Sequence, residues 1–209
     1  MPNVLVLGGT GFVGRSLCEK LVGRYGGAGA RIIVPSRRPD RARGIWMLPT
    51  VELFKADLHD DRELNRLVAH CDTVVNLVGI LHGSEAAFDR VHVQLPRRLA
   101  QACLGANVNR VVHVSALGAA ANAPSRYLRS KAAGEAALVS KALDLTVLRP
   151  SVMFGDGDRF LNLFARLQAI FPVIPLAGAQ ARFQPVWVDD VASAIVRCLD
   201  DRTTIGQTI

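Results

Sequence analysis

Short runs of apolar residues alternate with longer segments in which apolar residues recur every three or four positions. The apolar runs cover residues 4–7, 31–34, 51–54, 73–78, 110–114 and 145–148, and the helix-like segments cover residues 12–25, 60–69, 84–105 and 125–142. Parallel strands appear in sequence as short apolar runs, and amphipathic helices connect them on both faces of the sheet. The pattern therefore predicts an α/β fold with a doubly wound parallel sheet. A loop or short helix is expected at 39–49.

The pattern changes after residue 148, where Pro150, Pro172, Pro175 and Pro185 interrupt it. A short helix is predicted at 160–170, a strand at 186–188, and a helix at 191–199 capped by Asp189 and Asp190. We therefore expect a dinucleotide-binding domain over 1–150. Residues 151–209 are expected to be the start of a smaller substrate lobe, interleaved with the core and incomplete.

A glycine-rich turn, VLVLGGTGFVG at residues 4–14, follows the first apolar run directly. Gly8 allows the chain to leave the strand, Gly11 allows backbone contact with a diphosphate, and Gly14 allows close packing of the next helix. The start of that helix offers free N–H groups to phosphates. An ordinary turn is the alternative, but its place between a first strand and a first helix predicts a Rossmann-like nucleotide site.

Composition narrows the class of protein. The chain has 209 residues, half of them hydrophobic, and its four cysteines are widely separated, as expected of buried thiols in a reducing compartment. No membrane span, signal peptide or transit peptide is expected, which predicts a cytoplasmic protein. The net charge of +7 comes mostly from arginine. It fits a solvated surface, a phosphorylated cofactor or the inner face of an anionic membrane, whereas the few aromatic residues argue against nucleic acid.

The segment after the second strand favours NADP(H) over NAD(H). An NAD site usually has a carboxylate here, but this chain has Ser36, Arg37 and Arg38, which suit a 2′-phosphate. The alternative is that both arginines face solvent. Asp57 follows the third strand and either binds an adenine amino group or caps a helix, and Gly79 either makes room for a ribose or forms a turn.

Tyr127 and Lys131 lie four residues apart in a predicted helix, so they share one helix face. A lysine ammonium beside a phenol lowers the pKa of the phenol, and together with a positively charged nicotinamide it would make Tyr127 a proton donor to a carbonyl. A surface helical pair is the alternative. The histidines show no metal-ligand spacing, so no metal is expected, and Trp46 and Trp187 are expected to pack.

Several motifs together resemble an extended short-chain dehydrogenase/reductase. They are GGTGFVG at 8–14, YLRSK at 127–131, RPSVMFG at 149–155 and PVWVDDVA at 185–192. Within that superfamily, NLVGIL at 76–81, VHVSALGA at 112–119 and DRFLNLFARL at 158–167 are most similar to the atypical group around the 39 kDa, NADPH-binding accessory subunit of respiratory complex I.

The resemblance implies a Rossmann-like fold, bound NADP(H) or NAD(H), and an unknown carbonyl or alcohol substrate. It implies catalytic roles for Tyr127, Lys131 and Ser115, and cofactor contacts at Gly8, Thr10, Gly11, Phe12, Val13, Gly14, Ser36, Arg37, Arg38, Asp57, Leu58, Val78, Gly79, Lys131 and Pro150. Two helper positions depart from the active pattern, because the catalytic hydroxyl aligns with Ser115 or Ala116 and the usual helix asparagine is replaced around His92.

These departures leave three functions open. The chain is expected to be an NADP(H)-binding oxidoreductase-like protein. It is alternatively a catalytically weak accessory protein, peripherally associated with a membrane respiratory complex or linked to quinone metabolism. A sugar-nucleotide epimerase or dehydratase is the third alternative.

Overall fold

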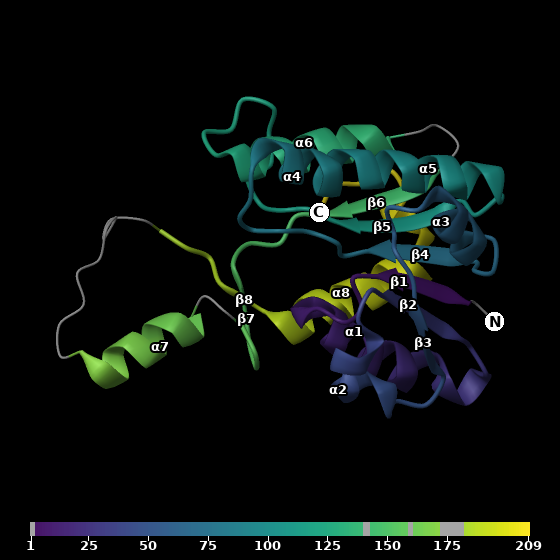
Figure 1. Cartoon of the computed structure of the whole chain (residues 1–209), viewed down its shortest axis with the longest axis horizontal. Coiled ribbons are helices and arrows are strands. Elements are labelled where there is room, and N and C mark those ends of the chain that lie inside the picture. The colour runs from purple at the N-terminus through teal and green to yellow at the C-terminus, as the bar shows by residue number, and fades with distance from the viewer. Residues whose placement is uncertain (1–2, 140–142, 159–160, 172–181) are drawn as a thin grey trace.

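Six parallel strands form one sheet in the order β3-β2-β1-β4-β5-β6 in the computed structural model, which describes residues 3–139, 143–158, 161–171 and 182–209 (Figure 1). The strands are β1 (Val4–Leu7), β2 (Ile32–Ser36), β3 (Val51–Lys55), β4 (Thr73–Asn76), β5 (Arg110–Val114) and β6 (Asp144–Leu148). Their order reverses between β1 and β4, and ligands of open α/β sheets bind at such a point, beyond the carboxyl ends of the strands. The predicted doubly wound sheet is confirmed.

Helices cover both faces of the sheet because each strand sends alternate side chains to opposite sides. Val4 and Val6 pack into the core beneath α1 (Phe12–Tyr25), α2 (Arg43–Trp46) and α8 (Val188–Asp200). Leu5 and Leu7 pack into the opposite core, beneath α3 (Asp61–Val68), α5 (Leu95–Gly105) and α6 (Arg126–Leu138). Figure 1 shows the sheet between these two layers.

The helix predicted at 84–105 is present, but its middle part is π-helical rather than α-helical. It consists of α4 (Glu85–Phe88), the π-helical segment η3 (Asp89–Gln94) and α5, which carries a proline in its first turn. Apolar periodicity does not distinguish a π turn from an α turn, so the sequence pattern concealed the change. In the segment 39–49, the short helices η2 (Pro39–Arg41) and α2 form as expected.

The C-terminal part returns to the main sheet. β7 (Met153–Phe154) pairs with β8 (Val186–Trp187), and α7 (Leu161–Ile170) lies to one side of the sheet (Figure 1). Helix α8 packs against α1, where Tyr25 donates to a carboxylate oxygen of Asp200 at 2.5 Å. The final residues run along β6, since Ile209 N–H donates to Val147 O at 2.9 Å.

Two expectations about side chains are wrong. Asp189 and Asp190 do not cap the last helix, because α8 begins at Val188 and both carboxylates lie in its first turn, where they favour the positive end of the helix dipole. Trp46 and Trp187 do not pack in the core, because 71% and 49% of their surfaces are exposed. Three parts of the sequence prediction lie outside the described residues. They are the pattern breaks at Pro172 and Pro175, the start of the helix predicted at 160–170, and the end of the helix predicted at 125–142. All four cysteines are buried and free, as expected.

Candidate functional site: a cavity at the carboxyl edge of the sheet

The turn after β1 can be built only from glycine at two positions. Gly8 has a φ of +83°, and a Cβ there would lie 3.2 Å from the Val78 backbone nitrogen. A Cβ on Gly14 would overlap the carbonyl oxygens of Gly8 and Gly9. The start of α1 therefore approaches the turn directly, and no side chain caps the helix. This leaves its N-terminal N–H groups available to an anion.

A cavity of about 880 Å³ opens beside this turn, at the carboxyl ends of β1, β2, β3 and β4. Of the residues expected to bind a cofactor, it is lined by Gly8, Thr10, Ser36, Arg37, Arg38, Asp57, Leu58, Val78 and Gly79. Gly11, Phe12, Val13, Gly14, Lys131 and Pro150 are not part of its lining, and neither are the expected catalytic residues Tyr127 and Ser115. Nine of the fifteen residues expected to contact a cofactor therefore line one cavity.

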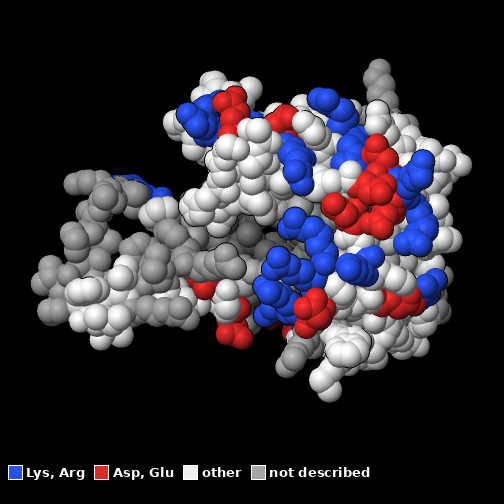
Figure 2. All heavy atoms as spheres, viewed as in Figure 1, with Lys and Arg blue, Asp and Glu red and all other residues white. Residues whose placement is uncertain are grey.

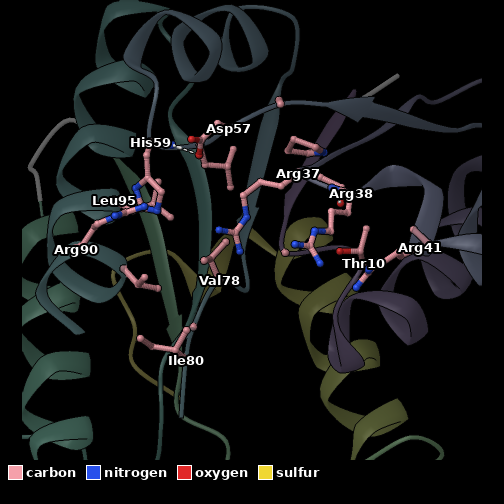
Figure 3. A pocket seen from close by; sticks show the side chains of 18 of the residues that line it. Thr10, Arg37, Arg38, Arg41, Asp57, His59, Val78, Ile80, Arg90 and Leu95 are labelled. Atoms are coloured by element: carbon pink, nitrogen blue, oxygen red, sulfur yellow. Dashed lines mark hydrogen bonds between the residues drawn. The ribbon is translucent and has the colours of Figure 1, made fainter. Parts of the chain in front are cut away.

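Arginine dominates the charge of this cavity, whose lining includes Arg15, Arg37, Arg38, Arg41 and Arg90. Among the described residues, none of these five forms an ion pair, and Asp57 is the one carboxylate in the lining. Figure 2 shows Lys and Arg side chains gathered around a hollow. In Figure 3, Arg38 and Arg41 lie on one side of the cavity and Arg90 on the other. Unpaired guanidinium groups around one cavity favour an anionic ligand.

The end of β2 presents Ser36 to this basic side. Its hydroxyl accepts a hydrogen bond from Arg38 N–H at 3.2 Å, and its carbonyl accepts one from Ala56 N–H at 3.1 Å. These bonds hold the 36–38 turn next to the end of β3. The sequence missed Arg41 and Arg90. Arg41 lies in η2 and Arg90 in η3, and both line the cavity; neither position has a local sequence signal.

Asp57 lies at the end of β3, where its Oδ1 accepts from His59 N–H at 3.0 Å. The alternative that Asp57 caps the next helix is wrong, because Asp60 caps α3 by accepting from Arg62 N–H and Glu63 N–H. His59 also lines the cavity and was not predicted to do so. Burial lowers its pKa, and the neighbouring charge of Arg90 lowers it further.

Lys131 lies in the protein interior, on the helix face that it shares with Tyr127. Helix α6 begins after Ser125, whose hydroxyl accepts from Leu128 N–H. Lys131 Nζ donates to Val114 O at 2.8 Å, and a Cβ on Gly79 would lie 4.0 Å from it. Burial lowers the pKa of Lys131 to about 8. A surface pair is therefore excluded for Lys131.

Tyr127 is half-buried and Ser115 is buried. Burial raises the pKa of Tyr127. The sequence predicts the opposite direction, a lowered pKa, for a tyrosine that has both a lysine and a nicotinamide beside it. Ser115 is buried at the end of β5, and its Oγ has no hydrogen-bond partner among the described residues. Ala116, the other candidate position, is also buried and carries no hydroxyl.

The glycine turn, the switch point and the basic cavity define a dinucleotide-binding site on a Rossmann-like sheet. Residues 4–208 match the model of the NAD dependent epimerase/dehydratase family. The chain belongs to this family, which is that of the extended short-chain dehydrogenase/reductases.

Named relatives include a subunit of NADH dehydrogenase and a reductase. The chain is 36% identical over 210 residues to the mouse "NADH dehydrogenase [ubiquinone] 1 alpha subcomplex subunit 9, mitochondrial", covering 97% of this chain and 54% of the relative. It is 32% identical over 195 residues to the "Ceramide reductase" of Caulobacter vibrioides, covering 92% and 59%. The chain thus spans somewhat more than half the length of these relatives.

A solved structure shows the same fold. The dTDP-glucose 4,6-dehydratase DesIV of Streptomyces venezuelae, a double mutant with NAD and DAU bound, superposes with a TM-score of 0.84 at 22% identity, covering 99% of this chain and 74% of DesIV. None of the helices in the described part of this chain has both the length and the apolar character needed to cross a membrane.

Proposed function

We propose that this chain binds NADP(H) in preference to NAD(H), as an oxidoreductase-like protein acting on a carbonyl or alcohol substrate. The observation that carries the proposal is the end of β2, where Ser36, Arg37 and Arg38 line the cavity with no carboxylate among them. A guanidinium attracts a 2′-phosphate, whereas the ribose 2′-OH of NAD gives it no charge to bind.

The residues present fit the rest of a dinucleotide. The Gly8–Gly14 turn and the uncapped start of α1 would hold the diphosphate. Asp57 would accept a hydrogen bond from the adenine amino group, beside Leu58. Gly79 and Lys131 would hold the second ribose. When bound, the nicotinamide supplies or accepts hydride; Pro150 would lie beside it.

The chemistry of this chain's own residues would centre on Tyr127. As general acid it would donate its phenolic proton to the carbonyl oxygen, and the Lys131 ammonium would stabilise the phenolate that remains. Ser115 would orient the carbonyl, provided that its hydroxyl reaches the substrate.

One observation favours a second candidate function. The Ser115 hydroxyl is buried and is not part of the cavity lining, and without such a helper proton transfer would be slow while cofactor binding persists. In this alternative the protein is a catalytically weak accessory protein with NADP(H) as a stabilising ligand. It would associate peripherally with a respiratory complex at the inner face of a membrane; the mouse relative is named as a subunit of NADH dehydrogenase [ubiquinone].

Calorimetry with NADPH and NADH tests the cofactor preference. Loss of two charge-assisted bonds should cost about 3 kcal/mol, so Arg37→Ala/Arg38→Ala should bind NADPH about a hundredfold more weakly and NADH almost unchanged. The matched control is Arg62→Ala/Arg66→Ala, two exposed arginines of α3 outside the cavity. Equal affinity of the wild type for NADPH and NADH, or an equal loss in the control, would overturn the proposal.

A further inference from the structure

Two large apolar side chains project from the short helix α2, none of whose residues line the cavity. Trp46 is 71% exposed, and Met47, which directly follows the helix, is 90% exposed. Trp46 belongs to none of the aromatic pairs in the described part of the chain. Adjacent apolar side chains that do not pack against the fold mark a candidate contact surface.

The segment that carries these side chains is anchored from its other side. Ile45 is buried and packs, with Ala42 and the partly buried Leu48, in the core beneath α1, α2 and α8. The backbone is fixed as well, because Trp46 N–H donates to Ala42 O at 3.3 Å. Leu48 N–H donates to Ile45 O at 3.2 Å. The two exposed side chains therefore cannot turn inward without withdrawing Ile45 and Leu48 from that core.

Exposed cations adjoin this apolar pair. Arg38 and Arg41 precede α2 in consecutive helical turns, in which Arg41 N–H donates to Arg38 O at 3.1 Å. The five residues from Arg41 to Trp46 span about 8–10 Å at a helical rise. Both arginines are exposed, and neither forms an ion pair with any residue that the structure describes. Asp40 is the one carboxylate against four arginines in residues 37–48, so the segment is basic.

We propose that Trp46 and Met47, together with Arg38 and Arg41, form a tip that docks on an anionic lipid membrane. An indole ring combines an apolar body with a polar N–H, which suits the boundary between headgroups and acyl chains, and a methionine side chain buries readily beside it. The arginines attract anionic headgroups, as does the net charge of +7. The inference goes beyond the proposed function, because contact with lipid needs no bound cofactor.

The size of the tip favours lipid over a protein partner. Each side of a standard protein–protein interface contributes ~800 Å² of surface, and two side chains expose well under that area. A membrane needs no shape complementarity, so one apolar pair with neighbouring cations is enough to hold a protein at its surface reversibly.

Tryptophan fluorescence tests the apolar contact, because Trp46 and Trp187 are the two tryptophans of the chain. In Trp187→Phe, Trp46 should emit at shorter wavelength on vesicles of equal parts phosphatidylcholine and phosphatidylglycerol, and brominated acyl chains should quench it. In Trp46→Phe, the emission of Trp187 should stay unchanged. Nucleotide is left out, since Arg38 also belongs to the proposed 2′-phosphate site. Unchanged emission of Trp46, or an equal shift of Trp187, would overturn the proposal.

Cosedimentation with the same vesicles separates the apolar from the charged contact. Met47→Ser should bind about tenfold more weakly, and Arg41→Gln about fivefold more weakly. The matched control is Val139→Ser, because Val139 is 72% exposed and follows α6, on the other face of the sheet. It should bind as the wild type does, and thermal melting checks that each variant is folded.

Three results of the cosedimentation would contradict the proposal. Met47→Ser binds as well as the wild type, or Val139→Ser loses as much as Met47→Ser does. Alternatively, the wild type binds vesicles of phosphatidylcholine alone as well as it binds the anionic vesicles. A wild type that binds neither kind of vesicle also overturns the proposal, and the tip is then a surface for a protein partner.

Discussion

Replacing Lys131 with methionine is expected to stabilise the free protein at neutral pH. Lys131 is 4% exposed, and its ammonium donates to Val114 O at 2.8 Å. Burial lowers its pKa from the ordinary value of 10.5 to about 8. Methionine has a similar length and no charge, so it removes the cost of a buried charge without leaving a large cavity.

The magnitude follows from the lowered pKa of Lys131. At about 1.36 kcal/mol per pH unit, the buried charge costs about 3 kcal/mol below pH 8. The lost bond to Val114 O offsets about 1 kcal/mol, which leaves a net gain of about 2 kcal/mol for Lys131→Met. Between pH 8 and 10.5 the unfolded chain holds the proton and the folded chain does not, so the stability of the wild type rises with pH. The advantage of the variant therefore disappears across that window.

Urea unfolding of the wild type and Lys131→Met at pH 7, 8.5 and 10 measures this difference. Lys55→Met is the control, because Lys55 is exposed on β3 and should change the free energy of unfolding by less than about 0.5 kcal/mol at every pH. A Lys131→Met protein that is less stable at pH 7, or whose difference from the wild type does not fall by pH 10, would refute the reasoning. The variant should also bind NADPH more weakly, since Lys131 supplies the ammonium that we propose to hold the second ribose.

Three other substitutions address the reaction, the turn and the core. Tyr127→Phe should bind NADPH almost as the wild type does. Its turnover of any carbonyl that the wild type reduces should fall by about 10²–10⁴-fold. Unchanged turnover would contradict the proposed role of Tyr127 as general acid. Gly11→Val should fold, because Gly11 has an ordinary φ of −79°. It should bind NADPH at least about tenfold more weakly, because the branched side chain would occupy the diphosphate position. Normal NADPH binding with earlier melting would show that the glycine only forms the turn. Arg110→Met should lower the free energy of unfolding in urea by about 3 kcal/mol. Buried Arg110 donates to the carbonyl oxygens of Asp144 and Cys198, and both oxygens would lose this partner. A loss below about 1 kcal/mol would show that these bonds are dispensable.

The sequence predicted best where one local pattern determines one local structure. The strands β1 and β5 and the helix α1 have the bounds predicted for them, because an apolar run and a glycine turn depend on neighbouring residues alone. Several of the residues expected to contact a cofactor also line one cavity. These residues lie at the ends of β1, β2, β3 and β4, and the carboxyl ends of parallel strands meet at one edge of the sheet.

The features that the sequence did not reveal depend on contacts between distant segments. The apolar periodicity at 84–105 predicts one helix, but the close backbone contact of η3 with Gly134 of α6 accompanies a π turn that places His92 inside. Likewise, the spacing of Tyr127 and Lys131 places them on one helix face, but only the packing of α6 against β5 buries Lys131 and lowers its pKa. The sequence by itself thus determined the sheet, the glycine turn and the identity of the charged groups. The tertiary structure decided their protonation and their partners, because burial and hydrogen bonding depend on atoms that are distant along the chain.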